Sequence, residues 1–199
     1  MAESSALISR SYANRRRALR TCIVRRLKEP KTLFHEIIEP HYLMAQTTPQ
    51  VGAQAPAVSL TSNDGKQVSL NDYKGKWVVL YFYPKDFTSG CTLEAQNFQR
   101  DLAKYQNASA IILGVSVDNA ESHKQFCAKE GLNFKLLADT DTKVSEAYGS
   151  LKDYDGKKMS ARNTFIINPE GKIAKVFTGV KPQAHSEEVL QALAELKKS

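Results

Sequence analysis

Cysteine is scarce in this chain of 199 residues, which holds three: Cys22, Cys91 and Cys127. So few and so scattered cysteines exclude a small secreted scaffold held together by disulfides and favour a reducing compartment. Long apolar runs are also missing, and none approaches the roughly 20 residues of a membrane-spanning helix. The apolar content of 42% and the charged content of 25% are ordinary for a soluble globular protein. The length allows one full domain and a short extension.

The net charge of +7 is distributed unevenly along the chain. Residues 1–44 hold nine Lys and Arg against four Asp and Glu, whereas residues 45–199 hold 19 against 17. The basic excess therefore belongs mostly to the N-terminal segment. It gives no reason to expect a nucleic-acid groove on the rest of the chain, and we expect no nucleic-acid partner and no membrane partner.

The segment 1–44 has three possible interpretations. It is rich in Arg, Ser and Ala and poor in acidic residues, which is typical of a chloroplast or other organelle transit peptide. Met44 begins a stretch that resembles a natural start, so residues 1–43 could instead result from a misassigned start codon. A basic arm that binds an acidic surface is the third option. In each case the folded domain is expected to span 45–199. A transit peptide implies a chloroplast or another organelle, and otherwise a bacterial cytoplasm is expected.

Hydrophobic patterning predicts an α/β domain from about residue 50. The turn signal Asn63-Asp64-Gly65 predicts an N-terminal β-hairpin. Continuous apolar runs predict buried strands over 77–83 and 110–117. Further strands are expected over 57–60, 66–70, 136–137, 164–167 and 172–178, and helices from Cys91 through Tyr105, over 118–128, over 144–148 and over 189–196. This order predicts a mixed central sheet flanked by helices.

Cys91 occupies the point where the strand over 77–83 gives way to a helix. A thiol in the first turn of a helix faces free backbone N–H groups and the positive end of the helix dipole, and both stabilise a thiolate. Pro84 fixes the backbone before it, and the hydroxyl of Thr88 lies three residues upstream. The alternative is an inert, buried cysteine that packs as a small apolar residue.

An activated thiolate also needs a cation, and Arg162 is the candidate. It enters a strand that we expect to pair near the strand before Cys91. A guanidinium there could stabilise the thiolate and hold two substrate oxygens. By spacing alone, an arginine at the start of a strand is more often simply solvated.

Several motifs make the chain similar to one known family. Pro84, Thr88 and Cys91 match the Pro-x-x-x-Thr/Ser-x-x-Cys signature of peroxiredoxins. The run from Val78 to Ala95 resembles the peroxiredoxin Q, or bacterioferritin comigratory protein, subfamily. Further matches are Asp118-x-x-x-Ser122-His123-Lys124-x-Phe126, Leu136-Leu137-Ala138-Asp139 and Arg162-x-Thr164-Phe165-Ile166-Ile167. The resemblance covers about residues 50–197.

This resemblance implies a thioredoxin-like fold and a thiol peroxidase without cofactor or metal. Cys91 would be the peroxidatic nucleophile, oxidised to sulfenic acid by hydrogen peroxide or an organic hydroperoxide. Thr88 would position the peroxide, Arg162 would stabilise the thiolate, and Pro84 would shield the sulfenate. Thioredoxin or a similar dithiol would be the reductant. Glu94 would hold Arg162 in place, and the protein would be a monomer active in oxidative-stress defence.

The chain departs from the subfamily at one position. Many members carry a resolving cysteine five residues after the first, where this chain has Gln96. A subgroup carries it on a later helix, and Cys127 matches that arrangement. The alternatives are a packing role for Cys127, with an external thiol reducing Cys91 directly, or a metal pair of His123 and Cys127. Cys22 is interpreted as incidental.

Two other functions compete with a peroxidase. A thiol–disulfide oxidoreductase of the same fold would need Cys-x-x-Cys, where this chain has Thr88-Ser89-Gly90-Cys91. A peroxide sensor or holdase would signal through oxidation of Cys91 without turnover. A module that binds through the basic segment would lose its function on deletion of residues 1–44.

Overall fold

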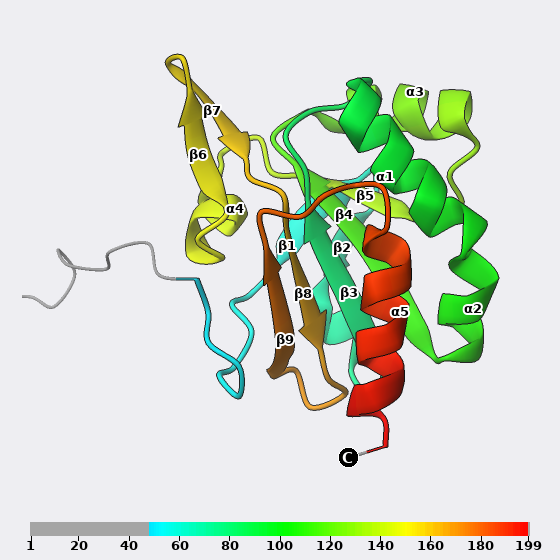
Figure 1. Ribbon diagram of the computed structural model, residues 1–199. Helices are drawn as coiled ribbons and strands as arrows, with labels where there is room; N and C mark the ends of the chain where they lie inside the picture. The colour runs from blue at the N-terminus through cyan, green and yellow to red at the C-terminus, as the bar shows by residue number, and fades with distance from the viewer. Residues whose placement is uncertain (1–47, 199) are drawn as a thin grey trace, which may run out of the picture. The chain divides into compact units, whose positions relative to one another are not determined.

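The computed structural model describes residues 48–198. The predictions for the segment 1–44, including those for Cys22 and Met44, lie outside the described residues. Figure 1 shows a sheet with helices on both sides. Within residues 48–198, no helix is both long and apolar enough to cross a membrane.

The main sheet has seven strands in the order β2-β1-β5-β4-β3-β8-β9. The strands are β1 (Ser59–Ser62), β2 (Gln67–Ser69), β3 (Trp77–Phe82), β4 (Ala110–Ser116), β5 (Lys135–Ala138), β8 (Asn163–Ile167) and β9 (Ile173–Thr178). Strands β3, β4 and β5 are parallel, while β8 and β9 continue the sheet antiparallel beyond β3. The predicted mixed sheet and the hairpin of β1 and β2 are thus confirmed.

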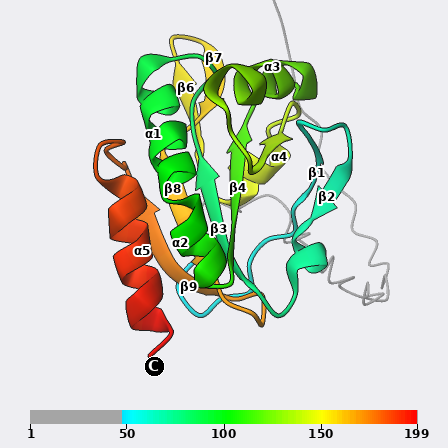
Figure 2. The same ribbon diagram turned by 90° about the vertical axis from the view of Figure 1, so that its right-hand side faces the viewer.

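The two faces of the sheet are covered by different elements. Helices α1 (Ser89–Arg100), α2 (Leu102–Asn107), α3 (Ala120–Glu130) and α5 (His185–Leu196) cover one face, and α4 (Lys143–Ala147) with the 3₁₀ turn η1 (Leu70–Tyr73) covers the other. Figure 2 shows α1 and α5 toward one edge of the sheet and β1 and β2 at the other edge. Alternate residues of β3 enter the two cores: Val79 and Tyr81 face α1, and Leu80 and Phe82 face α4. Burial on both faces explains its uninterrupted apolar sequence.

The helix predicted from Cys91 through Tyr105 is wrong in one respect, because it is interrupted at Asp101. Asp101 has φ −94° and ψ 3° and separates α1 from α2. Its buried carboxylate accepts hydrogen bonds from Arg100, Lys104 and the Ser186 hydroxyl of α5. The hydrogen bonds from Arg100, which outweigh the opposing effect of desolvation, lower the pKa of Asp101. The apolar stripe is therefore shared by two helices joined at an ionic junction.

Two further details differ from the prediction. The helix expected over 118–128 instead begins at Ala120 and ends at Glu130, and its N-cap Asn119 accepts the N–H of Ser122 with its side chain. A two-stranded ribbon of β6 (Leu151–Tyr154) and β7 (Lys157–Ser160) was not predicted. Its turn has positive φ at Asp155 and Gly156, the geometry that an Asp-Gly hairpin turn requires. The ribbon lacks the alternating apolar pattern that predicts strands, and the Asp-Gly turn is the one feature of its sequence that indicates a hairpin.

His185 makes stability depend on pH. Its ring is fully buried at the start of α5, where Nε2 contacts the Thr164 hydroxyl at 2.8 Å. Burial lowers the pKa of His185 from 6.5 to about 4, although Glu188 opposes the shift. The unfolded chain therefore binds a proton below pH 6.5 that the folded protein excludes, so this contribution to stability is complete above pH 6.5 and lost on acidification towards pH 4.

We expect His185→Gln to remove this pH dependence. Between pH 7.5 and pH 5, the wild type should lose about 2 kcal/mol of unfolding free energy that the variant does not lose. Urea denaturation of both proteins at the two pH values measures the difference. Equal slopes of stability against pH would contradict the prediction.

Candidate active site

The first turn of α1 holds Cys91. Thr88 is the N-cap with extended backbone (φ −81°, ψ 146°), and its carbonyl accepts the first intrahelical bond, from Thr92 N–H at 2.9 Å. The N–H groups of Ser89, Gly90 and Cys91 therefore have no acceptor within the helix. Cys91 is 1% exposed. Helix dipole and free donors thus favour negative charge where the sulfur lies.

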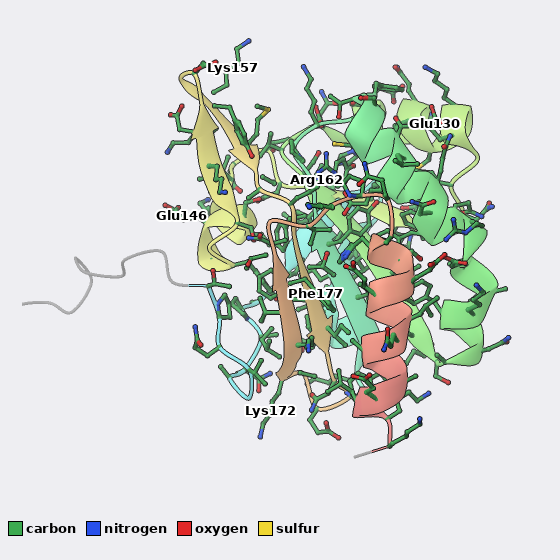
Figure 3. The ribbon with its side chains drawn as sticks, viewed as in Figure 1. Glu130, Glu146, Lys157, Arg162, Lys172 and Phe177 are labelled. Atoms are coloured by element: carbon green, nitrogen blue, oxygen red, sulfur yellow. The ribbon has the colours of Figure 1, made fainter. Side chains whose placement is uncertain are left out.

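Arg162 reaches this thiol because of strand register. Phe82, the last residue of β3, pairs with Asn163, the first residue of the antiparallel β8. Arg162 therefore lies beside the carboxyl end of β3, and Figure 3 shows its side chain at that end of the sheet. Its Nη2 donates to Cys91 Sγ at 3.2 Å. A Cβ at Gly90 would lie 3.0 Å from the same Nη2, so glycine leaves room for the guanidinium.

Glu94 holds the other arm of the guanidinium. Arg162 Nη1 donates to Glu94 Oε2, one helical turn after Cys91. Burial raises the pKa of Glu94 to about 7, even though the charge of Arg162 lowers it. At Arg162 the balance is reversed: burial lowers the pKa, but Glu94 and Cys91 outweigh this effect and raise the pKa of Arg162 above its ordinary value. The guanidinium thus remains charged and is fixed in orientation.

Thr88 and Pro84 border the same site. The Thr88 hydroxyl donates to Lys85 O at 3.1 Å, which leaves its oxygen lone pairs available to a donor outside the protein. Pro84 directly follows the buried Tyr83 and is half-buried. The structure therefore brings Pro84, Thr88, Cys91 and Arg162 to one edge of the sheet. At this edge, α/β proteins commonly bind ligands.

Sequence reasoning missed the residue that anchors this loop, Asp86. It is 3% exposed, and its carboxylate accepts hydrogen bonds from the Tyr83 and Ser122 hydroxyls and contacts His123 Nδ1 at 2.9 Å. Although burial raises it, hydrogen bonding to His123 and the charge of that ring leave the pKa of Asp86 below its ordinary value. The Ser122-His123 motif supplies two partners of Asp86, but the motif alone does not indicate which residue they contact.

Cys127 lies on α3, which neighbours α1. Gln96 of α1 donates to Glu130 of α3 at 2.8 Å. Gln96 lies five positions after Cys91, and Glu130 lies three positions after Cys127. Both cysteines are free thiols in the same apolar cluster. Burial, followed by the charge of Asp86, raises the pKa of Cys127 to about 12. In this conformation Cys127 is therefore protonated and unreactive.

The alternative of a metal pair formed by His123 and Cys127 is not supported. Both ring nitrogens of His123 face protein acceptors, Nδ1 at Asp86 and Nε2 at Leu137 O. Among residues 48–198 there is also no group of three or more potential side-chain ligands that could hold a metal ion.

Comparison with known proteins identifies this arrangement. Residues 51–176 match the model of the AhpC/TSA family. "Putative peroxiredoxin bcp" of Helicobacter pylori strain J99 is 43% identical over 148 residues, which cover 72% of this chain and 97% of that protein. "Peroxiredoxin Bcp" of Bacillus subtilis strain 168 is 42% identical over 153 residues, covering 75% and 98%.

Solved structures agree with this similarity. A cysteine-to-serine mutant of PrxQ from Xylella fastidiosa superposes with a TM-score of 0.71 at 34% identity, covering 75% of this chain and 98% of that one. A structure of Xanthomonas campestris bacterioferritin comigratory protein, described in connection with its alkyl peroxide reduction activity, gives 0.66 at 38% identity, covering 69% and 90%. The chain therefore belongs to the AhpC/TSA family and, within it, to the peroxiredoxin Q or bacterioferritin comigratory protein group of thiol peroxidases.

Proposed function

We propose that Cys91 is the peroxidatic cysteine of this enzyme and that Arg162, Thr88 and Pro84 form its active site. The observation that carries the proposal is the 3.2 Å contact between Arg162 Nη2 and Cys91 Sγ at a helix N-terminus. A buried thiol with a guanidinium and free backbone donors around it is a stabilised nucleophile, not an inert packing group. The alternative of an inert Cys91 does not account for this placement.

In the first step, the Cys91 thiolate attacks the terminal oxygen of the hydroperoxide. The S–O bond forms as the O–O bond breaks, and the leaving alkoxide or hydroxide takes up a proton to give alcohol or water. Thr88, whose hydroxyl hydrogen is directed at Lys85 O, would accept the O–H of the hydroperoxide. Arg162 would stabilise the thiolate and the negative charge that develops on oxygen. Pro84, half-buried beside the site, would limit solvent access to the sulfenic acid formed.

We further propose that Cys127 resolves this sulfenic acid. Condensation of Cys91–SOH with Cys127–SH gives a disulfide and one water molecule. The contact between Gln96 and Glu130 supports this assignment, because it joins the helices that carry the two thiols. Burial raises the pKa of Cys127 to about 12, so the step requires local opening that exposes this thiol.

Thioredoxin or a similar dithiol then completes the cycle. Two thiols of the reductant exchange with the Cys91–Cys127 disulfide, so that the reductant leaves oxidised and both cysteines return to thiols. Such a cycle requires a reducing compartment, for which cytoplasm and organelle stay equally suitable. Since both cysteines belong to one chain, we infer that a monomer suffices, and this can be tested by light scattering after size-exclusion chromatography.

Peptide mapping by mass spectrometry under non-reducing conditions tests these roles. The reduced protein is treated with one equivalent of hydrogen peroxide, and we expect a Cys91–Cys127 disulfide. In the matched variant Cys127→Ser, the sulfenic acid should persist on Cys91 and be captured by dimedone. Turnover with thioredoxin should be lost in this variant, whereas a single oxidation of Cys91 should remain.

The other outcomes lead to different assignments. Oxidation of Cys91 without a disulfide would reduce Cys127 to a packing residue and indicate direct reduction by an external thiol. An unmodified Cys91 would contradict its peroxidatic role. Stoichiometric oxidation without turnover by any dithiol would instead favour a peroxide sensor.

A further inference from the structure

A polar cluster whose central residues are buried lies under the loop between β3 and α1. Its members are the side chains of Tyr83, Asp86, Asp118, Ser122 and His123. His123 is 0% exposed and Asp86 is 3% exposed, so water does not compensate for any charge that they carry. Buried polar groups of this kind destabilise the fold unless every donor and acceptor among them forms a hydrogen bond.

The bonding pattern determines the charges of the two central residues. Tyr83 Oη donates to Asp86 Oδ1 at 2.8 Å and Ser122 Oγ donates to Oδ2 at 2.7 Å, so both oxygens act as acceptors. His123 Nδ1 lies 2.9 Å from Asp86 Oδ2, and Nε2 lies 3.2 Å from Leu137 O. Both neighbours can act as acceptors, so each ring nitrogen can donate to one of them. With both nitrogens donating, His123 would be an imidazolium paired with an Asp86 carboxylate.

The pair joins the two segments that carry the cysteines. Asp86 lies between Pro84 and Thr88, five residues before Cys91, and its own N–H donates to Asp118 Oδ2 at 2.8 Å. His123 is on α3, one helical turn before Cys127. Opening of the loop before Cys91 must therefore break the fully buried contact between Asp86 and His123, unless α3 moves with it.

We propose that the buried Asp86–His123 ion pair is a positioning device that holds the loop of Cys91 in its peroxide-reactive conformation and delays formation of the disulfide with Cys127. The role of Cys127 in this statement rests on the proposed function. The pair touches neither Cys91 nor substrate in the folded conformation. It acts through the placement of Thr88 and of the first turn of α1, and through the charge of Asp86 near Cys127.

The pair should therefore have opposite effects on the rates of the two chemical steps. The first step needs the folded loop, since Thr88, Cys91 and Arg162 meet only there. The second step needs the loop to open, since both thiols are buried. Weakening the pair should therefore slow the first step and accelerate the second. A general loss of stability gives no reason to expect the two rates to change in opposite directions.

The charge of His123 can be measured on the unmodified protein. A ¹H–¹⁵N correlation spectrum of the imidazole rings at pH 7 should show both nitrogens of His123 with the chemical shifts of an imidazolium. The signal is assigned by its absence from His123→Gln. A neutral ring, with one protonated and one unprotonated nitrogen, would overturn the ion pair without reference to any cysteine.

The positioning role is tested by stopped-flow kinetics of Asp86→Asn and His123→Gln. Each variant should react with hydrogen peroxide roughly tenfold more slowly and form the disulfide from the sulfenic acid roughly tenfold faster, because a buried pair loses one partner. The double variant should change both rates by less than the product of the single effects. Its two neutral amides no longer leave an uncompensated charge.

A matched control separates this role from loss of global stability. Ile173→Ala removes a buried side chain of β9 in the core on the opposite face of the sheet. This control should lower the unfolding free energy without moving the two rates in opposite directions. Equal behaviour of control and pair variants would overturn the proposal. If no Cys91–Cys127 disulfide forms in the wild type, only the role of Cys127 fails, and the spectrum with the first-step rate still decides the positioning role.

Discussion

Replacing Cys91 by serine should lower the second-order rate constant for reduction of hydrogen peroxide by at least about a thousandfold, because a hydroxyl is a far weaker nucleophile than a thiolate. Serine nearly matches cysteine in size, so the fold should be retained. The Arg162 guanidinium would then contact a neutral hydroxyl. Stopped-flow fluorescence and a turnover assay with thioredoxin measure the change.

Cys127→Ser is the matched control for this substitution. It changes the same chemical group in the same apolar cluster. In the proposed cycle Cys127 acts only after the sulfenic acid has formed, so the first step should stay within a few-fold of wild type while turnover with thioredoxin fails. Comparable loss of the first step in both variants would mean that the cluster, and not the nucleophile, had been disturbed.

Replacing Arg162 by glutamine should lower the same rate constant by roughly a hundredfold to a thousandfold, the usual effect of removing one preorganised donor from a charged transition state. The thiolate would lose its 3.2 Å contact with Nη2. Glu94, fully buried, would lose the guanidinium that now holds its pKa down to about 7. The carboxyl group would then keep its proton to still higher pH.

The sign of the resulting pH effect follows from linkage. A raised pKa of Glu94 in the folded state means that the variant binds a proton which the unfolded chain releases above pH 4.5. The unfolding free energy of Arg162→Gln should therefore fall more steeply than that of wild type between pH 6 and pH 9. Urea denaturation across this range measures it.

The double variant Arg162→Gln/Glu94→Gln separates stability from catalysis. With no ionisable group left at either position, its stability should lose the excess pH dependence. Its reaction with peroxide should stay as slow as that of Arg162→Gln, because the thiolate still lacks its cation. Recovery of the rate together with stability would show that Arg162 acts only by balancing Glu94.

The arrangement of strands could be predicted closely because burial is written into the chain. Val78 to Phe82 are buried on alternate faces, which requires an uninterrupted apolar run, and this run marked the central strand. The break at Asp101 could not be predicted in the same way. It depends on Ser186 and Lys104, and Ser186 reaches Asp101 only after α5 has packed against α1.

The features of the active site likewise divide into those that the sequence predicts and those that only the folded structure decides. Sequence by itself determined the family, the strand-to-helix position of Cys91 and the candidates around it, because local backbone chemistry and motif spacing lie within a short stretch of chain. Tertiary structure alone decided that Arg162, 71 residues away, donates to Cys91, since this depends on the register of β8 against β3. It alone joined Asp86 to His123, because the charge of a buried residue depends on the groups that fold around it.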